Sequence, residues 1–344
     1  MNRLALALLT ATVCAATAGV ALADDALRPD GTLKYRFYTD WELLYLERDG
    51  PPDTDVGFFD PTAPPAGGAD IVEVLSTDDA IEDGYEFGGR AVLGYRLDPE
   101  SALELVFIGL EDDGGASESD PGANLQALIG GGAGSIAQAN NASFENATRF
   151  TLDYDSDFYS GELNYRHDME VPGADYRFSL LAGLRGVRFT EDLRFTSVSP
   201  GSGVGTHDVA SRNTLFGAQI GFDTFIPLYE DRIEFDLAGV AGGYANQSST
   251  TADFNNQAPA FRYRESRTEW GPAAVLEASG FLKFRIYRGV RLSAGYRAIY
   301  LVNVATASDQ FPESASNSDF FGNRFDNDGR TLYHGPSLKV SVDF

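Results

Sequence analysis

The segment VRLSAGYRAIYLVNV, residues 290–304, decides the fold class of this chain. Apolar side chains occupy every second position, Val290 and Tyr296 among them, while Arg291 and Arg297 occupy the positions between. The side chains of a β-strand point alternately to its two faces, whereas those of a helix repeat every 3.6 residues. The pattern therefore predicts a strand with one apolar face and one polar face.

The same alternation recurs along the chain and predicts ten strands. They cover residues 33–47, 85–97, 101–110, 148–167, 175–195, 211–226, 231–246, 267–286, 289–304 and 332–344. Short connections, such as residues 98–100, alternate with long ones, such as residues 48–84. An even number of strands with short turns on one rim and long loops on the other is typical of a bacterial outer-membrane barrel. We therefore expect an all-β fold, a transmembrane antiparallel up-and-down β-barrel with short periplasmic turns and long extracellular loops.

The strand at residues 148–167 changes the phase of its pattern. Phe150 and Tyr154 are on even positions, whereas Tyr159 and Tyr165 are on odd ones. A β-bulge near residues 155–157 would restore the facing, because it adds one residue to one strand. The alternative is a hidden hairpin, which would bring the barrel to twelve strands.

A water-soluble β-sandwich also alternates, but aromatic residues near the strand ends favour the barrel. These residues are Trp41, Tyr45, Tyr95, Tyr165, Phe222, Trp270 and Tyr300. Aromatic girdles are typical of a membrane interface. The last strand ends on Phe344, which resembles the C-terminal insertion signal of outer-membrane proteins. We therefore expect two partners, the outer-membrane lipids and the barrel-assembly machinery, which would recognise the strand ending in Phe344.

Residues 1–23 have the pattern of a secretory signal peptide. Arg3 is followed by a short apolar stretch, and Ala21 and Ala23 form a small-x-small cleavage site. The stretch is shorter than a transmembrane anchor requires. The one cysteine, Cys14, lies within it. We therefore predict export, a single barrel domain at residues 24–344 without disulfides, and a location in the bacterial outer membrane.

Composition excludes several classes of protein. With 51 acidic and 26 basic residues, the net charge of −25 would repel a phosphate backbone, so we expect no nucleic-acid partner. With 43% hydrophobic residues the chain is too apolar for a disordered acidic tail.

Two strands in the middle of the chain resemble a known family. Residues 181–193 read LAGLRGVRFTEDL and residues 212–221 read RNTLFGAQIG; the first strand contains DWELLYL at residues 40–46. These segments resemble the Legionella-type major outer-membrane protein family and its planctomycete-type β-barrel relatives, although Gly186 and Val187 stand where a tyrosine is commoner in that family. The resemblance covers the chain from about residue 180 onward. It implies a pore-forming outer-membrane barrel, and it offers no catalytic residue to carry over.

The polar strand faces carry charges of both signs. The residues we predict to line a pore are Arg90, Arg96, Arg177, Arg185, Asp236, Glu277, Arg285, Arg291 and Arg297. The same faces also carry Asp40, Glu42, Glu104, Glu162, Arg166, Asp223, Lys283 and Lys339. Barrels of about eight strands are just filled by side chains, and those of 16 to 18 strands hold a water channel. Ten strands are near the filled end, so pairing of these charges across the lumen could close it.

Two functions are compatible with this pattern. The first is a monomeric channel for small solutes or ions. The alternative is a closed structural or adhesive surface barrel whose acidic loops bind a partner or divalent cations. Residues 125–139 are expected to form a short helix or a loop that folds inward and narrows the lumen.

We predict that the protein is not an enzyme and holds no cofactor and no metal at a histidine site. His207 and Asp208 are adjacent, so on a strand they would point to opposite faces. His167, His207 and His334 lack a metal-ligand spacing, and none lies at a suggestive sequence distance from a serine.

Overall fold

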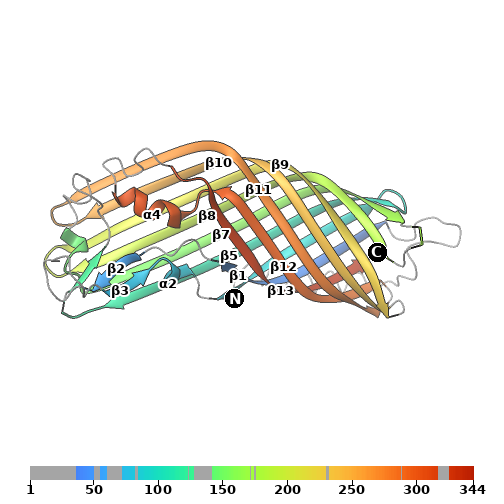
Figure 1. The fold of residues 1–344 in the computed structure, drawn as a ribbon, viewed down its shortest axis with the longest axis horizontal. Helices are drawn as coiled ribbons and strands as arrows, with labels where there is room; N and C mark the ends of the chain where they lie inside the picture. Colours follow the sequence, from blue (N-terminus) through green and yellow to red (C-terminus); the bar gives the residue numbers. More distant parts are fainter. Residues whose placement is uncertain are drawn as a thin grey trace.

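The structure, a computed structural model, describes residues 36–49, 55–59, 72–81, 84–122, 124–127, 142–170, 172–173, 176–229, 232–287, 289–316 and 325–344. Ten antiparallel strands form a closed barrel in the order β1-β13-β12-β11-β10-β9-β8-β7-β5-β4 (Figure 1). They are β1 (Phe37–Asp49), β4 (Tyr85–Arg96), β5 (Ser101–Ser119), β7 (Arg149–Glu170), β8 (Arg177–Ser199), β9 (Gly203–Tyr229), β10 (Ile233–Asn256), β11 (Phe261–Tyr287), β12 (Val290–Val304) and β13 (Gly329–Asp343). The all-β barrel of ten strands predicted from the sequence is confirmed. None of the described helices is long and apolar enough to cross a membrane.

The barrel closes where the two ends of the chain meet. The backbone N–H of Phe37 donates to the carbonyl oxygen of Phe344 (3.1 Å), and the N–H of Phe344 donates to that of Phe37 (2.9 Å). The short turns between β4 and β5, β7 and β8, β9 and β10, and β11 and β12 lie on this same rim. We call it the short-turn rim, and the opposite one the long-loop rim.

The strands extend further toward the long-loop rim than predicted. β9 begins at Gly203, β10 ends at Asn256 and β11 begins at Phe261. The long connections that the predicted strand bounds leave at residues 196–210 and 247–266 are therefore wrong, because only residues 200–202 and 257–260 separate these strands. These segments are rich in Ser, Thr and Asn, which weaken the apolar alternation that marks a strand.

The predicted bulge or extra hairpin in the strand at residues 148–167 is also wrong. β7 pairs with β5 and β8 in one continuous register from Arg149 to its last residues. Its even-numbered side chains point into the barrel throughout. Phe150 and Tyr154 are apolar inside, whereas Leu163 and Tyr165 are apolar outside, so it is the apolar face that changes sides while the backbone stays regular.

The outward side chains near the short-turn rim form a broad apolar belt. Leu105, Ile220 and Leu338 are 55%, 69% and 52% exposed. All seven aromatic residues that the sequence placed in the girdle lie on outward positions of their strands, with Trp270 69% exposed. Toward the long-loop rim the outward side chains are polar, as with Asp153 and Arg194.

The segments outside the barrel wall fill its interior near the long-loop rim. A small sheet has the order β3-β2-β6 and consists of β2 (Asp55–Phe59), β3 (Val72–Ser76) and β6 (Leu125–Ala127). The short helices α2 (Asp78–Ile81), η1 (Ala142–Phe144) and α4 (Ala307–Ser316) accompany it, and Figure 1 shows β2, β3 and α4 at the end of the barrel opposite the C-terminus. Residues 125–127 thus do fold inward, as a strand; residues 128–139 of that predicted segment lie outside the described residues.

We expect adjacent positions of β8 to respond oppositely to the same substitution. Phe195 is fully buried inside the barrel, and Thr196 faces outward. Phe195→Asp places a carboxylate among aromatic rings and should cost more than about 4 kcal/mol of unfolding free energy, while Thr196→Asp should change it by less than about 0.5 kcal/mol. Urea unfolding in detergent micelles, followed by gel mobility, measures both. Equal losses would contradict the assigned facing.

Candidate functional site

The lumen is divided into three layers along the barrel axis. The charged layer lies nearest the short-turn rim and contains the ionisable residues described below. The apolar layer follows, with inward side chains from all ten wall strands: Leu44, Leu46, Val92, Val106, Ile108, Leu110, Phe158, Val187, Phe189, Leu215, Tyr244, Ala273, Val275, Ile299, Leu301, Val304 and Tyr333. The upper core joins wall residues such as Phe195 and Phe254 to Val56, Leu75, Leu125 and Phe311 of the inner segments.

Five alternating charges cross the lumen in the charged layer. Arg297 Nε lies 2.8 Å from Glu42 Oε1, and Arg297 Nη1 lies 3.3 Å from Glu277 Oε2. Glu277 Oε1 lies 2.6 Å from Arg185 Nη1, which lies 3.5 Å from Glu162 Oε1. Glu277 is on β11 and Arg185 on β8, with two strands between them in the wall, so their contact spans the interior. Arg185 is 1% exposed, so this chain of charges blocks a straight path.

Further ion pairs lie between this chain and the short-turn rim. Asp236 is 3.3 Å from both Lys283 and Lys339. Arg166 is 2.7 Å from Glu104 and 3.0 Å from Asp223. Asp343 joins Arg96 (3.0 Å) to Arg291 (2.7 Å) nearest the rim.

Two polar cavities remain among these pairs. One of about 160 Å³ reaches the short-turn rim, where residues 98–101 line it together with Arg291 and Arg177. A second of about 70 Å³ lies deeper, beside Glu162, Glu277 and Arg297. Both are lined by charged and polar groups, so they can hold water. The charged layer therefore has room for water in two separate cavities, the larger of them at the short-turn rim.

All nine residues predicted to line a pore lie at inward positions of their strands. Eight of them form ion pairs, among them Arg90 with Glu42 (3.8 Å) and Arg177 with Glu234 (3.4 Å). Arg285 lies at the exposed end of β11 and takes part in none of the ion pairs seen among the described residues. Asp343 is absent from the predicted set, although its inward position on β13 follows from the alternation of that strand.

A buried ion pair above the apolar layer holds α4, and sequence reasoning did not find it. Arg48 of β1 pairs with Glu191 of β8, and both are at most 4% exposed. Glu191 Oε2 also accepts a hydrogen bond (2.6 Å) from the backbone N–H of Ala307, at the first turn of α4. Burial raises the pKa of Glu191 above its usual value, while Arg48 opposes that shift. The chain enters the lumen at a bulge where Asn303 has a φ of 59°, a conformation that asparagine tolerates.

His207 packs against α4 inside the upper core. Its ring centroid lies 4.7 Å from that of Phe311. Burial lowers the pKa of His207 from 6.5 to about 4. Asp208 points outward, where it accepts a hydrogen bond from Arg194 Nε (2.8 Å), so the two neighbours do point to opposite faces.

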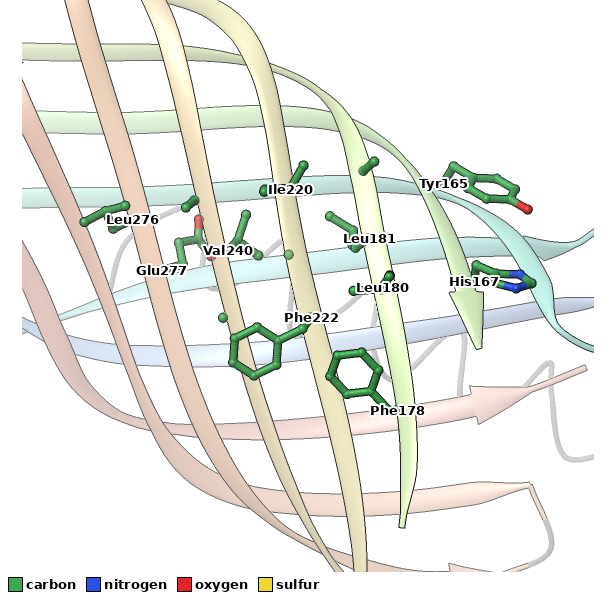
Figure 2. Close-up of a pocket in the computed structure, with 14 residues that line it drawn as sticks. Tyr165, His167, Phe178, Leu180, Leu181, Ile220, Phe222, Val240, Leu276 and Glu277 are labelled. Carbon is green, nitrogen blue, oxygen red and sulfur yellow. The ribbon is translucent and has the colours of Figure 1, made fainter. Parts of the chain in front are cut away.

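His167 lies beside a serine that is distant from it in the sequence. On the outer surface Ser101 Oγ is 3.2 Å from His167 Nδ1, and the Tyr165 hydroxyl donates to Ser101 Oγ (3.0 Å). The serine is on β5, so its distance in sequence hid the contact. Tyr165 and His167 lie at one end of an apolar groove of about 1090 Å³, with Leu180, Ile220 and Phe222 along it (Figure 2).

Comparisons with family models and with curated sequences find no match. Among solved structures, the outer-membrane protease OmpT of Escherichia coli is similar at 12% identity, with 91% of this chain and 99% of that chain covered and a TM-score of 0.49. A major outer membrane protein of Thermus thermophilus is similar at 9% identity, with 90% and 100% covered and a TM-score of 0.34. The CymD monoaromatic hydrocarbon channel is similar at 9% identity, with 91% and 89% covered and a TM-score of 0.33. Likenesses this distant carry no argument about activity.

We expect Arg185→Ala to cost about 3–5 kcal/mol of unfolding free energy, because it leaves Glu277 and Glu162 buried without that partner. The double variant Arg185→Met with Glu277→Met should cost less than the single Arg185→Met variant, because it removes the opposing charges together. Urea unfolding of the folded barrel measures all three. A double variant that loses more stability than Arg185→Met alone would contradict this coupling between the two side chains.

We expect acid to loosen the upper core through His207. The neutral imidazole is favoured in the folded state, so stability falls as pH drops from about 6.5 to about 4, by at most about 3 kcal/mol. His207→Gln should flatten this part of the pH profile, measured as unfolding free energy and as hydrogen exchange of residues 307–311. Carboxylates titrate in both proteins, so identical profiles would show that His207 is not responsible.

Proposed function

We propose that the protein is a bacterial outer-membrane channel for small solutes or ions, closed at rest by the apolar layer. The observation that supports it is a charged layer with a polar cavity at the short-turn rim, followed by a ring of apolar side chains contributed by every wall strand. Hydrophobic constrictions close pores because a narrow apolar passage excludes water. The ring therefore suits a gate in a narrow barrel.

The outer surface supports a membrane location. A belt of exposed Leu, Ile and Phe side chains would be costly in water and stable in lipid. The predicted signal peptide and the last strand ending in Phe344 favour export and insertion by the barrel-assembly machinery. On this proposal the short-turn rim faces the periplasm. Membership of the Legionella-type family, which the sequence resembles, is part of the same proposal.

The gate has a part that can move without opening the wall. The β2, β3 and β6 sheet makes no ladder with the barrel, and α4 is held by Glu191, by Asn213 next to its start, and by packing against His207. Their release would remove the upper core while the ten-stranded ladder stays intact. We propose that a passing solute requires this release together with wetting of the apolar layer.

The charged layer favours small solutes without strong charge selection. Its bases and acids alternate around the wall and are paired, so the interior presents no ring of one sign among the described residues. Rings of one sign produce strong ion selectivity. We propose that no cofactor, metal or enzymatic step is involved.

One observation favours the second candidate, a closed surface barrel. The apolar layer and the upper core are two separate clusters that together contain more than thirty buried apolar residues, as the interior of a soluble barrel does. A protein that needs only a rigid, polar outer surface beyond the membrane would have this interior. On that proposal the polar outer faces of β7 to β11 would contact the partner.

Single-channel conductance distinguishes the channel from the closed surface barrel. We expect the refolded protein to show rare, brief openings in a planar bilayer, and Ile299→Ser to increase the open fraction at least about tenfold, a change of ~1.4 kcal/mol. Ala298→Ser, the neighbouring outward position, is the matched control and should behave as wild type. Gel mobility without heating checks that each protein is folded.

Silence from folded, inserted wild type and Ile299→Ser alike would overturn the channel proposal and favour the closed surface barrel. Large steady steps from wild type would keep the channel and overturn the apolar gate.

A further inference from the structure

A slot in the apolar belt has a floor made of two glycines. Gly161 of β7 pairs directly with Gly186 of β8, and both face outward. The same row continues to Phe107 of β5 and Phe216 of β9, which are 45% and 64% exposed. Two phenyl rings thus flank a floor without side chains. The slot is part of an apolar groove of about 730 Å³ that continues toward Leu105 and Trp41.

The barrel's own packing does not require these glycines. A Cβ built on Gly161 would meet no atom within 4 Å, and one on Gly186 would meet only the Leu215 carbonyl oxygen at 3.9 Å. Glycine weakens a strand interior, and it often marks a place where a ligand approaches the backbone closely. The glycine pair therefore indicates a site on the outer surface where a ligand approaches the strand backbone closely.

The next row toward the long-loop rim is polar and carries a positive charge. Tyr159 and Arg188 form a direct cross-strand pair two residues beyond the glycines, on the same outer face. The Tyr159 hydroxyl donates to Glu111 (2.6 Å), which fixes the ring above the slot. Arg188 is exposed and takes part in none of the ion pairs seen among the described residues. The carboxylate of Asp157, in the row beyond, is not within ion-pair distance of the Arg188 guanidinium.

We propose that this groove binds an acyl lipid of the outer leaflet whose headgroup carries a phosphate. An acyl chain lies over Gly161 and Gly186 between the two phenyl rings, and the phosphate contacts the Arg188 guanidinium. Arginine suits this role because its planar fork matches phosphate oxygens. Charge complementarity selects this occupant over a second copy of the chain, because the slot is apolar and the exposed Arg188 guanidinium stands in the row beyond it, beside the Tyr159–Glu111 hydrogen bond.

The apolar groove of Figure 2, here called the companion groove, differs in its floor and in the residues at its end. Its floor includes Ala182 and Gly239, and at its end stand Tyr165 and His167 rather than an arginine. It serves as an internal control, since filling it should leave binding at the Arg188 groove unchanged.

The test is lipid retention by the folded full-length mature barrel in nonionic detergent, measured by native mass spectrometry with added lipid A. We expect one tightly retained lipid A per chain, and a dissociation constant at least about tenfold weaker for Arg188→Gln, which corresponds to ~1.4 kcal/mol. Gly161→Leu with Gly186→Leu should remove retention, since both side chains have room to fold into the slot. Dephosphorylated lipid A should bind wild type no better than Arg188→Gln does.

Two matched controls should match wild type: Arg262→Gln, an exposed outward arginine on β11, and Ala182→Leu in the companion groove. Unchanged retention in the glycine double variant would overturn the proposal. So would a wild-type dimer that this variant abolishes, because the occupant would then be a second copy. Binding requires only that the belt lies in lipid, so a failure of the conductance proposal is distinguishable from a failure here.

Discussion

The side chains of each long strand must change which face is apolar half-way along its length, and the rest of the structure follows from this constraint. The period of two is fixed by the backbone, so an unbroken strand cannot rotate its faces. On β8, Leu180 and Leu184 are apolar outside, while Phe189 and Phe195 are apolar inside. Leu180 and Leu184 belong to the outer apolar belt, whereas Phe189 and Phe195 face an interior shielded from water. One strand thus serves as a membrane barrel at one end and as a soluble barrel at the other.

The interior order follows from the same exchange. Where the outside is apolar, the polar residues occupy the inside, and in a ten-stranded barrel they are close enough to pair across the lumen, as Glu277 and Arg185 do. Burying such charges costs several kcal/mol per ion unless they are paired and hydrogen-bonded. The alternation of sign from Glu42 to Glu162 supplies the pairing, because each charge in it lies beside an opposite one. A closed charged layer is therefore the stable solution for this width.

The sequence predicted the fold well where one face was consistently apolar. β12 and β13 lie where expected, and the inward positions of Arg185, Arg297 and Glu277 follow from parity alone. The failures occurred where the faces exchange. β7 gave an apparent break at residues 155–157, although its register is continuous. Parity also cannot show which charges meet, because Arg48 and Glu191 are 143 positions apart. Nor does it indicate that the chain turns inward after Asn303, which depends on one backbone conformation.

Glycines that face into the barrel and glycines that face out of it have different surroundings. Inside the wall, glycine permits close approach: a Cβ at Gly217 or Gly295 would meet a neighbouring backbone oxygen at 2.1 Å. These glycines are explained by the barrel itself. Gly161 and Gly186 face outward into open space, so their lack of a side chain is unexplained by any contact within the described chain. Lipid would favour large apolar side chains at those positions, so the proposed bound lipid accounts for a cross-strand pair of glycines one row from an exposed arginine.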